Sequence, residues 1–390
     1  MAYFDLNPLL AKMLEVAPDI SDLNLSVGKP PQVEVSGKLQ GVPYAGVEKL
    51  SPYQTELIAM RLLGGKRDLI ERLLRTGSVD LSYSLAQRTR FRVSIFSQRG
   101  SYSVVLRVIP NRIPTVEELG LPPQVNEITE ERTGIVLVTG PTGSGKSTTL
   151  AAVINKLNHE KAIHVITIED PIEYLYPALQ ATINQREIGA DTENFAHALR
   201  AALRQAPKVI LVGEMRDVET INTALEASET GHLVLSTLHT IDASKTIDRI
   251  VGVFPKNEER QIRTRFSQSF QWIISQRLVP RKDGSRMAVC EILRGTARTR
   301  DYIREGEKEG KSLLDAMEDG ALEGMQTFDS ELQKLIESGV VDMETGLSYA
   351  SNSANLKLKL SMEGAQAQGG ASGDGATSTA SSEMNNLIER

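Results

Sequence analysis

The chain of 390 residues has almost no cysteine and no long hydrophobic run. Its single cysteine, Cys290, excludes an internal disulfide, and without a Cys-x-x-Cys pair a four-cysteine zinc site is excluded too. The longest apolar runs, such as residues 135–138, fall far short of the roughly 20 residues that a membrane-spanning helix needs. Residues 1–7 lack the basic and apolar regions of a secretory signal. These absences predict a protein of the reducing cytoplasm that reaches a membrane only through partners.

An excess of basic charge is also missing. The chain has 50 acidic and 44 basic residues and a net charge of −6, which argues against a dedicated nucleic-acid binder. What is present is 40% hydrophobic and 24% charged residues, enough for a substantial core. This composition excludes an intrinsically disordered or collagen-like chain, and the length predicts two or three domains.

Changes in local pattern divide the chain. Residues 1–110 mix helical and strand-like segments and predict an α+β domain, and the prolines that follow predict an interdomain linker over residues 111–123. Residues 124–363 alternate helices with nearly continuous apolar strands, which is typical of a mainly parallel sheet covered by helices. These strands are expected at residues 134–139, 164–168, 209–212 and 233–237.

The C-terminal third is predicted to be mostly helical from about Val251. An apolar stripe at helical spacing is interpreted as core packing; its members are Ile262, Phe266, Phe270, Ile273 and Ile274. Residues 364–382 contain no Leu, Ile, Val or aromatic residue, so residues 364–390 are predicted to form a flexible tail.

The strongest functional signal is a G-x-x-x-x-G-K-[ST] pattern between an apolar strand and a predicted helix. It consists of Gly140, Pro141, Thr142, Gly143, Ser144, Gly145, Lys146, Ser147 and Thr148. The glycines let backbone N–H groups surround phosphates at the N-terminus of the helix. Lys146 is expected to reach the β- and γ-phosphates and Ser147 to ligate Mg²⁺, so the motif predicts that ATP and Mg²⁺ bind here.

Acidic residues follow two other predicted strands. Glu214 ends the strand 209–212 in the Walker B position, where it is expected to hold Mg²⁺ through water. Glu169 and Glu173 follow the strand 164–168, and either could orient the water that attacks the nucleotide.

Histidine and arginine complete the set of candidate site residues. His239 follows the carboxyl end of the strand 233–237 and is predicted to sense the γ-phosphate, whereas His232, at the opposite end, is interpreted as structural or interfacial. Arg92 and Arg107 lie on neighbouring strands of a predicted hairpin, so they could converge. Together they are candidate arginine fingers for a neighbour's nucleotide, although arginine on a strand more often belongs to a solvated face.

Further motifs add to the P-loop over residues 140–255: residues 168–173 (Asp box), 184–187, 198–204, 211–217 (Walker B), 229–240 (His box) and 245–250. Residues 21–31 and 324–329 extend the pattern on either side. With these motifs the sequence resembles the type IV pilus retraction ATPases, the PilT/PilU group of the secretion ATPase superfamily.

The resemblance implies an α/β fold, with a RecA-like P-loop ATPase core, an N-terminal α+β PAS-like domain and a hexameric ring. It implies that Glu173 is the catalytic glutamate, that Glu214 is the Walker B acid, and that Arg92 and Arg107 reach ATP bound between the domains. The implied function is a homohexameric motor that hydrolyses ATP to power pilus retraction and twitching motility. Its implied partners are an inner-membrane platform protein and a paralogous retraction ATPase, with the motor peripheral to the inner membrane.

Other functions stay open at this point. A pilus assembly or type II secretion ATPase would be expected to carry an extra N-terminal domain and a four-cysteine zinc site. An accessory, PilU-like role is open because residues 295–305 depart from the A-I-R-N-L-I-R-E pattern frequent in retraction ATPases. A DNA-translocating motor is disfavoured by the acidic charge, and a non-hydrolysing nucleotide switch by Glu173 and Glu214.

Overall fold

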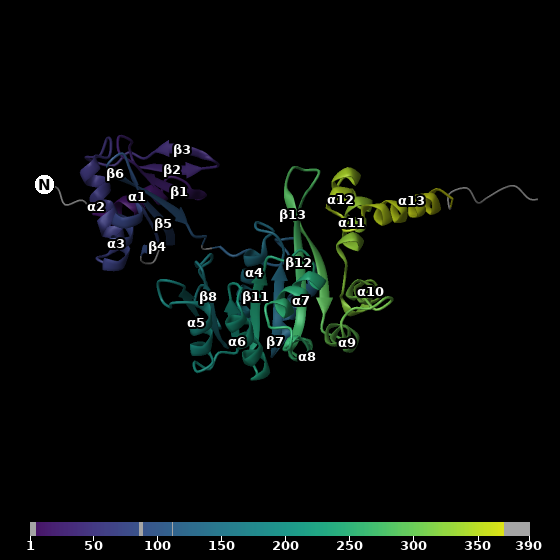
Figure 1. The fold of residues 1–390 in the computed structure, drawn as a ribbon. Coiled ribbons are helices and arrows are strands. Elements are labelled where there is room, and N and C mark those ends of the chain that lie inside the picture. The colour runs from purple at the N-terminus through teal and green to yellow at the C-terminus, as the bar shows by residue number, and fades with distance from the viewer. Residues whose placement is uncertain (1–4, 86–88, 111, 370–390) are drawn as a thin grey trace, which may run out of the picture.

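The computed structural model describes residues 5–85, 89–110 and 112–369, and side chains as far as residue 362. Figure 1 shows an N-terminal domain, a central domain built on a large sheet, and a group of C-terminal helices that follow one another along the molecule. Of the predicted tail, residues 370–390 lie outside the described part.

The N-terminal domain is an antiparallel sheet packed with helices, as the sequence predicted. Six strands lie in the order β3-β2-β1-β6-β5-β4. The elements are α1 (Leu6–Leu14), β1 (Ile20–Leu25), β2 (Gln32–Val35), β3 (Lys38–Gly41), α2 (Pro52–Leu63), α3 (Arg67–Thr76), β4 (Ser78–Leu85), β5 (Thr89–Gln98) and β6 (Ser101–Val108).

Buried and partly exposed side chains alternate along β5, so every second side chain lies on the outer face of the sheet. Phe91, Val93 and Ile95 are fully buried, whereas Arg90 and Arg92 lie on the opposite face and are half-buried. Because cross-strand partners share a face and Arg92 pairs directly with Arg107, all three arginines lie on the same outer face of the sheet.

The central domain contains a mainly parallel sheet of seven strands in the order β13-β12-β7-β11-β10-β8-β9. Only β13 runs antiparallel to its neighbour, β12. The elements are η1 (Pro123–Glu130), β7 (Gly134–Thr139), α4 (Lys146–Glu160), β8 (His164–Glu169), β9 (Thr182–Glu187), α5 (Phe195–Ala202), β10 (Val209–Val212), α6 (Val218–Glu229), β11 (Leu233–Leu238), α7 (Ala243–Gly252), α8 (Glu259–Ser269), β12 (Phe270–Pro280) and β13 (Arg286–Arg294). The four predicted strands are therefore confirmed.

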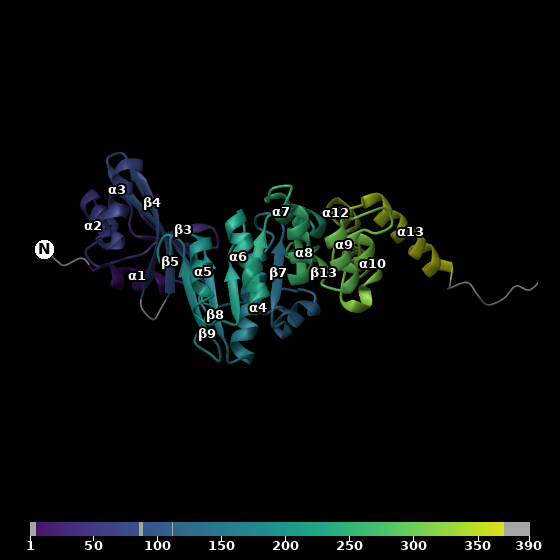
Figure 2. The same ribbon diagram turned by 60° about the horizontal axis from the view of Figure 1, so that its bottom comes forward.

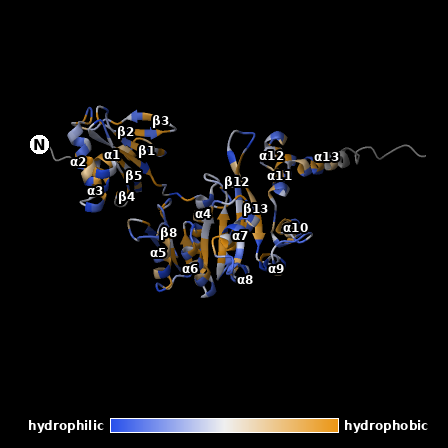
Figure 3. Cartoon of the chain, viewed as in Figure 1, coloured by the Kyte–Doolittle hydropathy of each residue, from blue (hydrophilic) through white to orange (hydrophobic). Residues whose placement is uncertain are grey.

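Helices cover both faces of this sheet, and successive residues of one strand enter different cores (Figures 1 and 2). On β7, Ile135 and Leu137 pack with α5, α6, α7 and α8, whereas Val136 and Val138 pack with α4 and η1. Every residue of β7, β10 and β11 is buried, which explains why their sequences are mostly apolar and contain no charged residue (Figure 3).

The prediction of a mostly helical C-terminal third was wrong over β12 and β13. Helix α8 ends at Ser269, and Phe270, Ile273 and Ile274 continue as a strand paired with β7. This strand lies between two others and is buried on both faces, so its apolar residues do not alternate, and periodicity alone could not separate it from a buried helix. The interpretation of the stripe as core was correct, since all five residues are buried.

The remaining helices are α9 (Ala297–Glu305), α10 (Leu313–Asp319), η2 (Ala321–Glu323), α11 (Phe328–Glu337), α12 (Met343–Tyr349) and α13 (Ser353–Gly369). Arg277 on β12 connects α11 and α12 to the central sheet. Its guanidinium donates to the backbone oxygen of Tyr349 at 2.5 Å and lies 3.8 Å from the ring centre of Phe328. Helix α13 continues to Gly369, so it extends into the segment that was predicted to be a flexible tail from residue 364 onward. None of the helices in the described ranges is long and apolar enough to cross a membrane.

Candidate nucleotide-binding site

The P-loop connects the end of β7 to the start of α4, and its first glycine sits where no other residue fits. Gly140 has a φ of +142°, and a Cβ there would lie 2.4 Å from the backbone oxygen of Gln276 and 2.6 Å from Ser144 Oγ. Gly145, with a φ of +94°, precedes the first helical residue, Lys146. The loop therefore turns tightly into the N-terminus of α4, where backbone N–H groups can bind an anion.

A cavity of about 460 Å³ opens beside the P-loop and is lined by most of the predicted catalytic residues. Those of its lining residues that the sequence singled out are Thr142, Gly143, Gly145, Lys146, Ser147, Thr148, Glu169, Glu173, Glu214 and His239. Parallel strands explain this convergence, since the carboxyl ends of β7, β8, β10 and β11 meet at one edge of the sheet.

Lys146 is held inside the loop that it belongs to. Its Nζ donates to the backbone oxygens of Gly140 at 3.0 Å and Pro141 at 3.1 Å, and the residue is only 7% exposed. Burial lowers the pKa of Lys146, and the nearby charges of Glu214 and Glu173 counteract part of that shift. The ammonium group is thus positioned where phosphates would replace carbonyl oxygens as its partners.

Glu214 is a carboxylate held between the guanidinium of Arg216 and the imidazole of His239. Arg216 Nη2 lies 2.5 Å and His239 Nε2 3.4 Å from Glu214 Oε2. Burial raises the pKa of Glu214, but the hydrogen bond and charge of Arg216, assisted by His239, outweigh it, and the net pKa is below the usual value. A carboxylate that stays charged is suited to hold a divalent cation.

The structure separates the two glutamates that the sequence left as alternatives. Glu169 is buried and accepts hydrogen bonds from Thr167 Oγ1 at 2.6 Å and Gln185 Nε2 at 3.1 Å, and burial raises its pKa. Glu173 is exposed and lines the cavity. Its backbone N–H donates to Glu169 Oε2 at 3.4 Å. This arrangement favours Glu173 as the residue that faces a nucleotide and Glu169 as its support.

The donors present suit a magnesium ion bound together with phosphates. Ser147 and Glu214 line the same cavity, and Mg²⁺ is usually bound by one or two side chains plus substrate phosphates and water. Across the described residues, no group of three or more His, Cys, Asp or Glu side chains is placed to hold a metal ion by itself.

The histidines and arginines occupy different places. His239 lines the cavity, whereas His232 lies before β11, where its Nδ1–H donates to the backbone oxygen of Ala227 in α6 at 2.9 Å. Arg92 and Arg107 are cross-strand partners, as expected, but both lie outside the lining of the cavity in a single chain. Arg107 Nε instead donates to Asp22 Oδ1 at 3.0 Å.

Comparison with known proteins places this site in a family. Residues 49–355 match the family described as type II/IV secretion system protein. The type IV pilus retractation ATPase PilT of Pseudomonas aeruginosa is 42% identical over 353 residues, which are 90% of this chain and 100% of PilT. A twitching motility protein of Neisseria gonorrhoeae is 47% identical over 281 residues, 72% of this chain and 75% of that protein. The chain belongs to this family of secretion ATPases.

A solved structure agrees with the family assignment. The crystal structure of the pilus retraction motor PilT with bound ADP matches at a TM-score of 0.77 and 41% identity, covering 90% of this chain and 98% of that one. The predicted α/β ATPase core with an α+β N-terminal domain is thereby confirmed.

Three features of this secretion ATPase site were missed in the sequence. Arg216, two residues after Glu214, pairs with it, and Tyr174 OH lies 3.1 Å from Thr148 Oγ1. Arg90, rather than Arg92 or Arg107, contacts the central domain of the same chain. The spacing of Glu214 and Arg216 on one segment was a usable signal, whereas the other contacts join distant segments.

A second cavity adjoins the P-loop of the secretion ATPase. The cavity, of about 700 Å³, lies between residues 141–144 and the C-terminal helices, and Arg277 and Arg286 contribute to its wall.

Glu291 on β13 is 4% exposed and accepts a hydrogen bond from the backbone N–H of Ala243, the first residue of α7, at 2.8 Å. Burial raises the pKa of Glu291 to about 7.

Proposed function

We propose that this protein is a motor that hydrolyses ATP to power retraction of type IV pili. The observation that carries the proposal is the cavity in which Lys146, Ser147, Glu173 and Glu214 come together. The similarity to PilT over its whole length supports retraction over the assembly and type II secretion alternatives.

Hydrolysis requires groups that position water and neutralise charge. When bound, ATP with Mg²⁺ supplies the phosphoryl group and a cation that neutralises its charge. Glu173, exposed toward the cavity, accepts a hydrogen bond from the attacking water and orients it. Lys146 binds the β- and γ-phosphates, and Ser147 and Glu214 hold the cation. The second cavity shares Thr142 and Gly143 with the first and gives room for the base and ribose.

The proposed active unit is a homohexameric ring. Within one chain Arg92 and Arg107 lie side by side on one face of the N-terminal sheet and do not line that chain's own cavity. A neighbouring subunit would therefore receive these arginines at its nucleotide, where an arginine finger contributes roughly 10³–10⁵-fold to turnover. The ring would act in the cytoplasm on an inner-membrane pilus platform protein, alone or beside a paralogous retraction ATPase.

Turnover of ATP by the purified full-length protein tests the proposed reaction. Wild type should hydrolyse ATP in the presence of Mg²⁺, and Glu173→Gln should lose nearly all activity while still binding nucleotide. Glu193→Gln, which changes an exposed glutamate outside the cavity, is the matched control and should keep wild-type activity. No hydrolysis by wild type would refute the motor and favour a nucleotide switch.

Deletion of the gene separates retraction from assembly. A retraction motor predicts cells that carry surplus surface pili and do not twitch. Cells without pili would instead identify an assembly ATPase. Twitching that persists at reduced force would identify the accessory role, which the altered sequence of residues 295–305 leaves open.

A further inference from the structure

The two domains of one chain meet at Glu187, the last residue of β9. Its side chain is almost fully buried, with 6% exposed, and its partner Arg90 in the N-terminal domain is 19% exposed. Arg90 Nη2 donates to Glu187 Oε2 at 3.0 Å, and Ser82 Oγ donates to Glu187 Oε1. Both donors come from the outer face of the N-terminal sheet, from strands β5 and β4.

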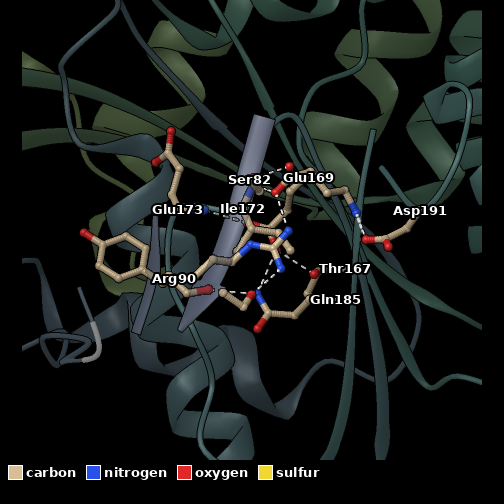
Figure 4. A network of polar contacts seen from close by, with 11 residues as sticks. Ser82, Arg90, Thr167, Glu169, Ile172, Glu173, Gln185 and Asp191 are labelled. Carbon is tan, nitrogen blue, oxygen red and sulfur yellow. Dashed lines mark hydrogen bonds and ion pairs between the residues drawn. The ribbon is translucent and has the colours of Figure 1, made fainter. Parts of the chain in front are cut away.

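The same carboxylate also holds the loop that carries the catalytic glutamate. The backbone N–H of Ile172 donates to Glu187 Oε2 at 3.3 Å, and the next backbone N–H, that of Glu173, donates to Glu169 Oε2. Figure 4 shows this loop beside Ser82 and Arg90, with the Glu173 carboxylate directed away from the network. Two neighbouring glutamates, paired in register on β8 and β9, thus fix two consecutive amides of the loop.

The two supports differ in what they contact. Glu169 is held by Thr167 and Gln185, both within the central domain, so its geometry does not depend on the other domain. Among the described residues, the Glu187 carboxylate accepts three hydrogen bonds, and two of them come from the N-terminal domain. When the domains separate, the Glu187 carboxylate therefore loses hydrogen bonds, whereas Glu169 keeps its partners.

We propose that Glu187 is a positioning residue that couples docking of the N-terminal domain to the placement of Glu173. The inference rests on the proposed ATPase function and names a control point of that site. With Arg90 and Ser82 docked, the carboxylate is fixed and Ile172 is held. When the N-terminal domain moves away, a buried carboxylate without its cation is unfavourable, so it turns to solvent and releases the loop. Both supports of the loop that carries Glu173 are then in place only while the domains are docked.

Turnover kinetics of the full-length protein test this coupling. Glu187→Gln and Arg90→Gln should each lower kcat at least ~10-fold, within the ~100-fold that a displacement of about 1 Å can cost. The KM for ATP and the affinity for a fluorescent ADP analogue should stay within about twofold, because the P-loop is untouched. The kcat of the double variant should be no lower than that of either single variant, since both changes remove the same ion pair between Arg90 and Glu187.

Two exposed residues give matched controls. Glu193→Gln and Arg72→Gln change the same side chains at solvent-exposed positions and should leave kcat unchanged. Arg90→Lys keeps the positive charge and should recover part of the activity, which a loss of packing alone would not predict.

Hydrogen exchange supplies a readout that does not depend on hydrolysis. The Ile172 amide should exchange at least ~10-fold faster in Glu187→Ala and in Arg90→Gln, because a hydrogen bond to a charged acceptor contributes about 1.5–3 kcal/mol. Amides of β7 and β11 should be unaffected. If Ile172 exchanges at the wild-type rate in both variants, the coupling is refuted.

The outcomes distinguish this inference from the proposed function. A wild type without ATPase activity refutes the motor, and the exchange result still decides whether Glu187 holds the loop. Full activity of Glu187→Gln beside an inactive Glu173→Gln refutes the coupling alone. A fall in kcat for Glu187→Gln that Arg90→Gln does not reproduce also refutes it, since the N-terminal domain would then have no part in the effect.

Discussion

Replacing Gly140 with alanine should destabilise the central domain much more than a glycine-to-alanine change in an open turn. At Gly140 the new methyl group would lie 2.4 Å from the backbone oxygen of Gln276, a contact that no side-chain rotation can relieve, and the φ of +142° strains any other residue. Gly284, in the turn between β12 and β13, is the matched control, because its φ is +83° and nothing lies within 4 Å of a Cβ there.

The expected magnitudes follow from these two geometries. At Gly140 the strained backbone costs about 1–3 kcal/mol and the overpacking about 1–3 kcal/mol more. Restriction of the unfolded chain offsets about 0.4–1 kcal/mol of this, so the free energy of unfolding should fall by about 2–5 kcal/mol. At Gly284 a left-handed alanine costs about 1–2 kcal/mol, and after the same offset the loss stays below about 1.5 kcal/mol.

Thermal unfolding of the two variants, followed by circular dichroism, measures the difference. With roughly 2–4 °C for each kcal/mol in a domain of 150–250 residues, Gly140→Ala should lower the unfolding midpoint by roughly 4–20 °C and Gly284→Ala by less than about 6 °C. Equal midpoints for the two variants would show that the P-loop backbone is not held against β12, and the reasoning from Cβ contacts would be wrong.

Three further predictions concern charge. Burial raises the pKa of Glu291 to about 7, so the folded state binds a proton more tightly than the unfolded state, and wild type should lose up to about 3 kcal/mol of stability as the pH rises from about 4.5 to 7. Glu291→Gln should lack this contribution, so urea unfolding between pH 5 and pH 8 should show the variant gaining stability relative to wild type as the pH rises; a constant difference would contradict it. Burial raises the pKa of Glu214 while Arg216 lowers it, so in Arg216→Ala the acid limb of the kcat/KM profile should move to higher pH. An unmoved limb would show that Glu214 does not set it. Finally, mixing inactive Arg92→Ala and Glu173→Gln subunits in equal amounts should restore about a quarter of the active sites if the arginine acts between subunits of a ring, and none if it acts within one chain.

Patterns within single segments predicted most of the fold and the core of the site. The P-loop, Glu214 and His239 each follow an apolar strand directly, so a parallel sheet brings them to one edge. The same local logic failed at β12, where burial on both faces removes the alternation that marks a strand.

Contacts between distant segments were beyond local patterns. Arg90 lies two residues before the candidate Arg92, but its pairing with Glu187 depends on how two domains dock, and 97 residues separate the pair. The choice between Glu169 and Glu173 likewise depended on burial, which only the packed structure supplies.

The lone cysteine has a practical consequence. Cys290 lies fully buried on β13, and burial raises the pKa of its thiol well above the usual range, so the folded protein should resist alkylating reagents. A cysteine introduced at the surface would then be the only thiol to accept a fluorophore, without removal of the native one. In the unlabelled protein, the rate at which Cys290 becomes reactive would measure how fast β13 separates from β12 and from α11, which cover the thiol.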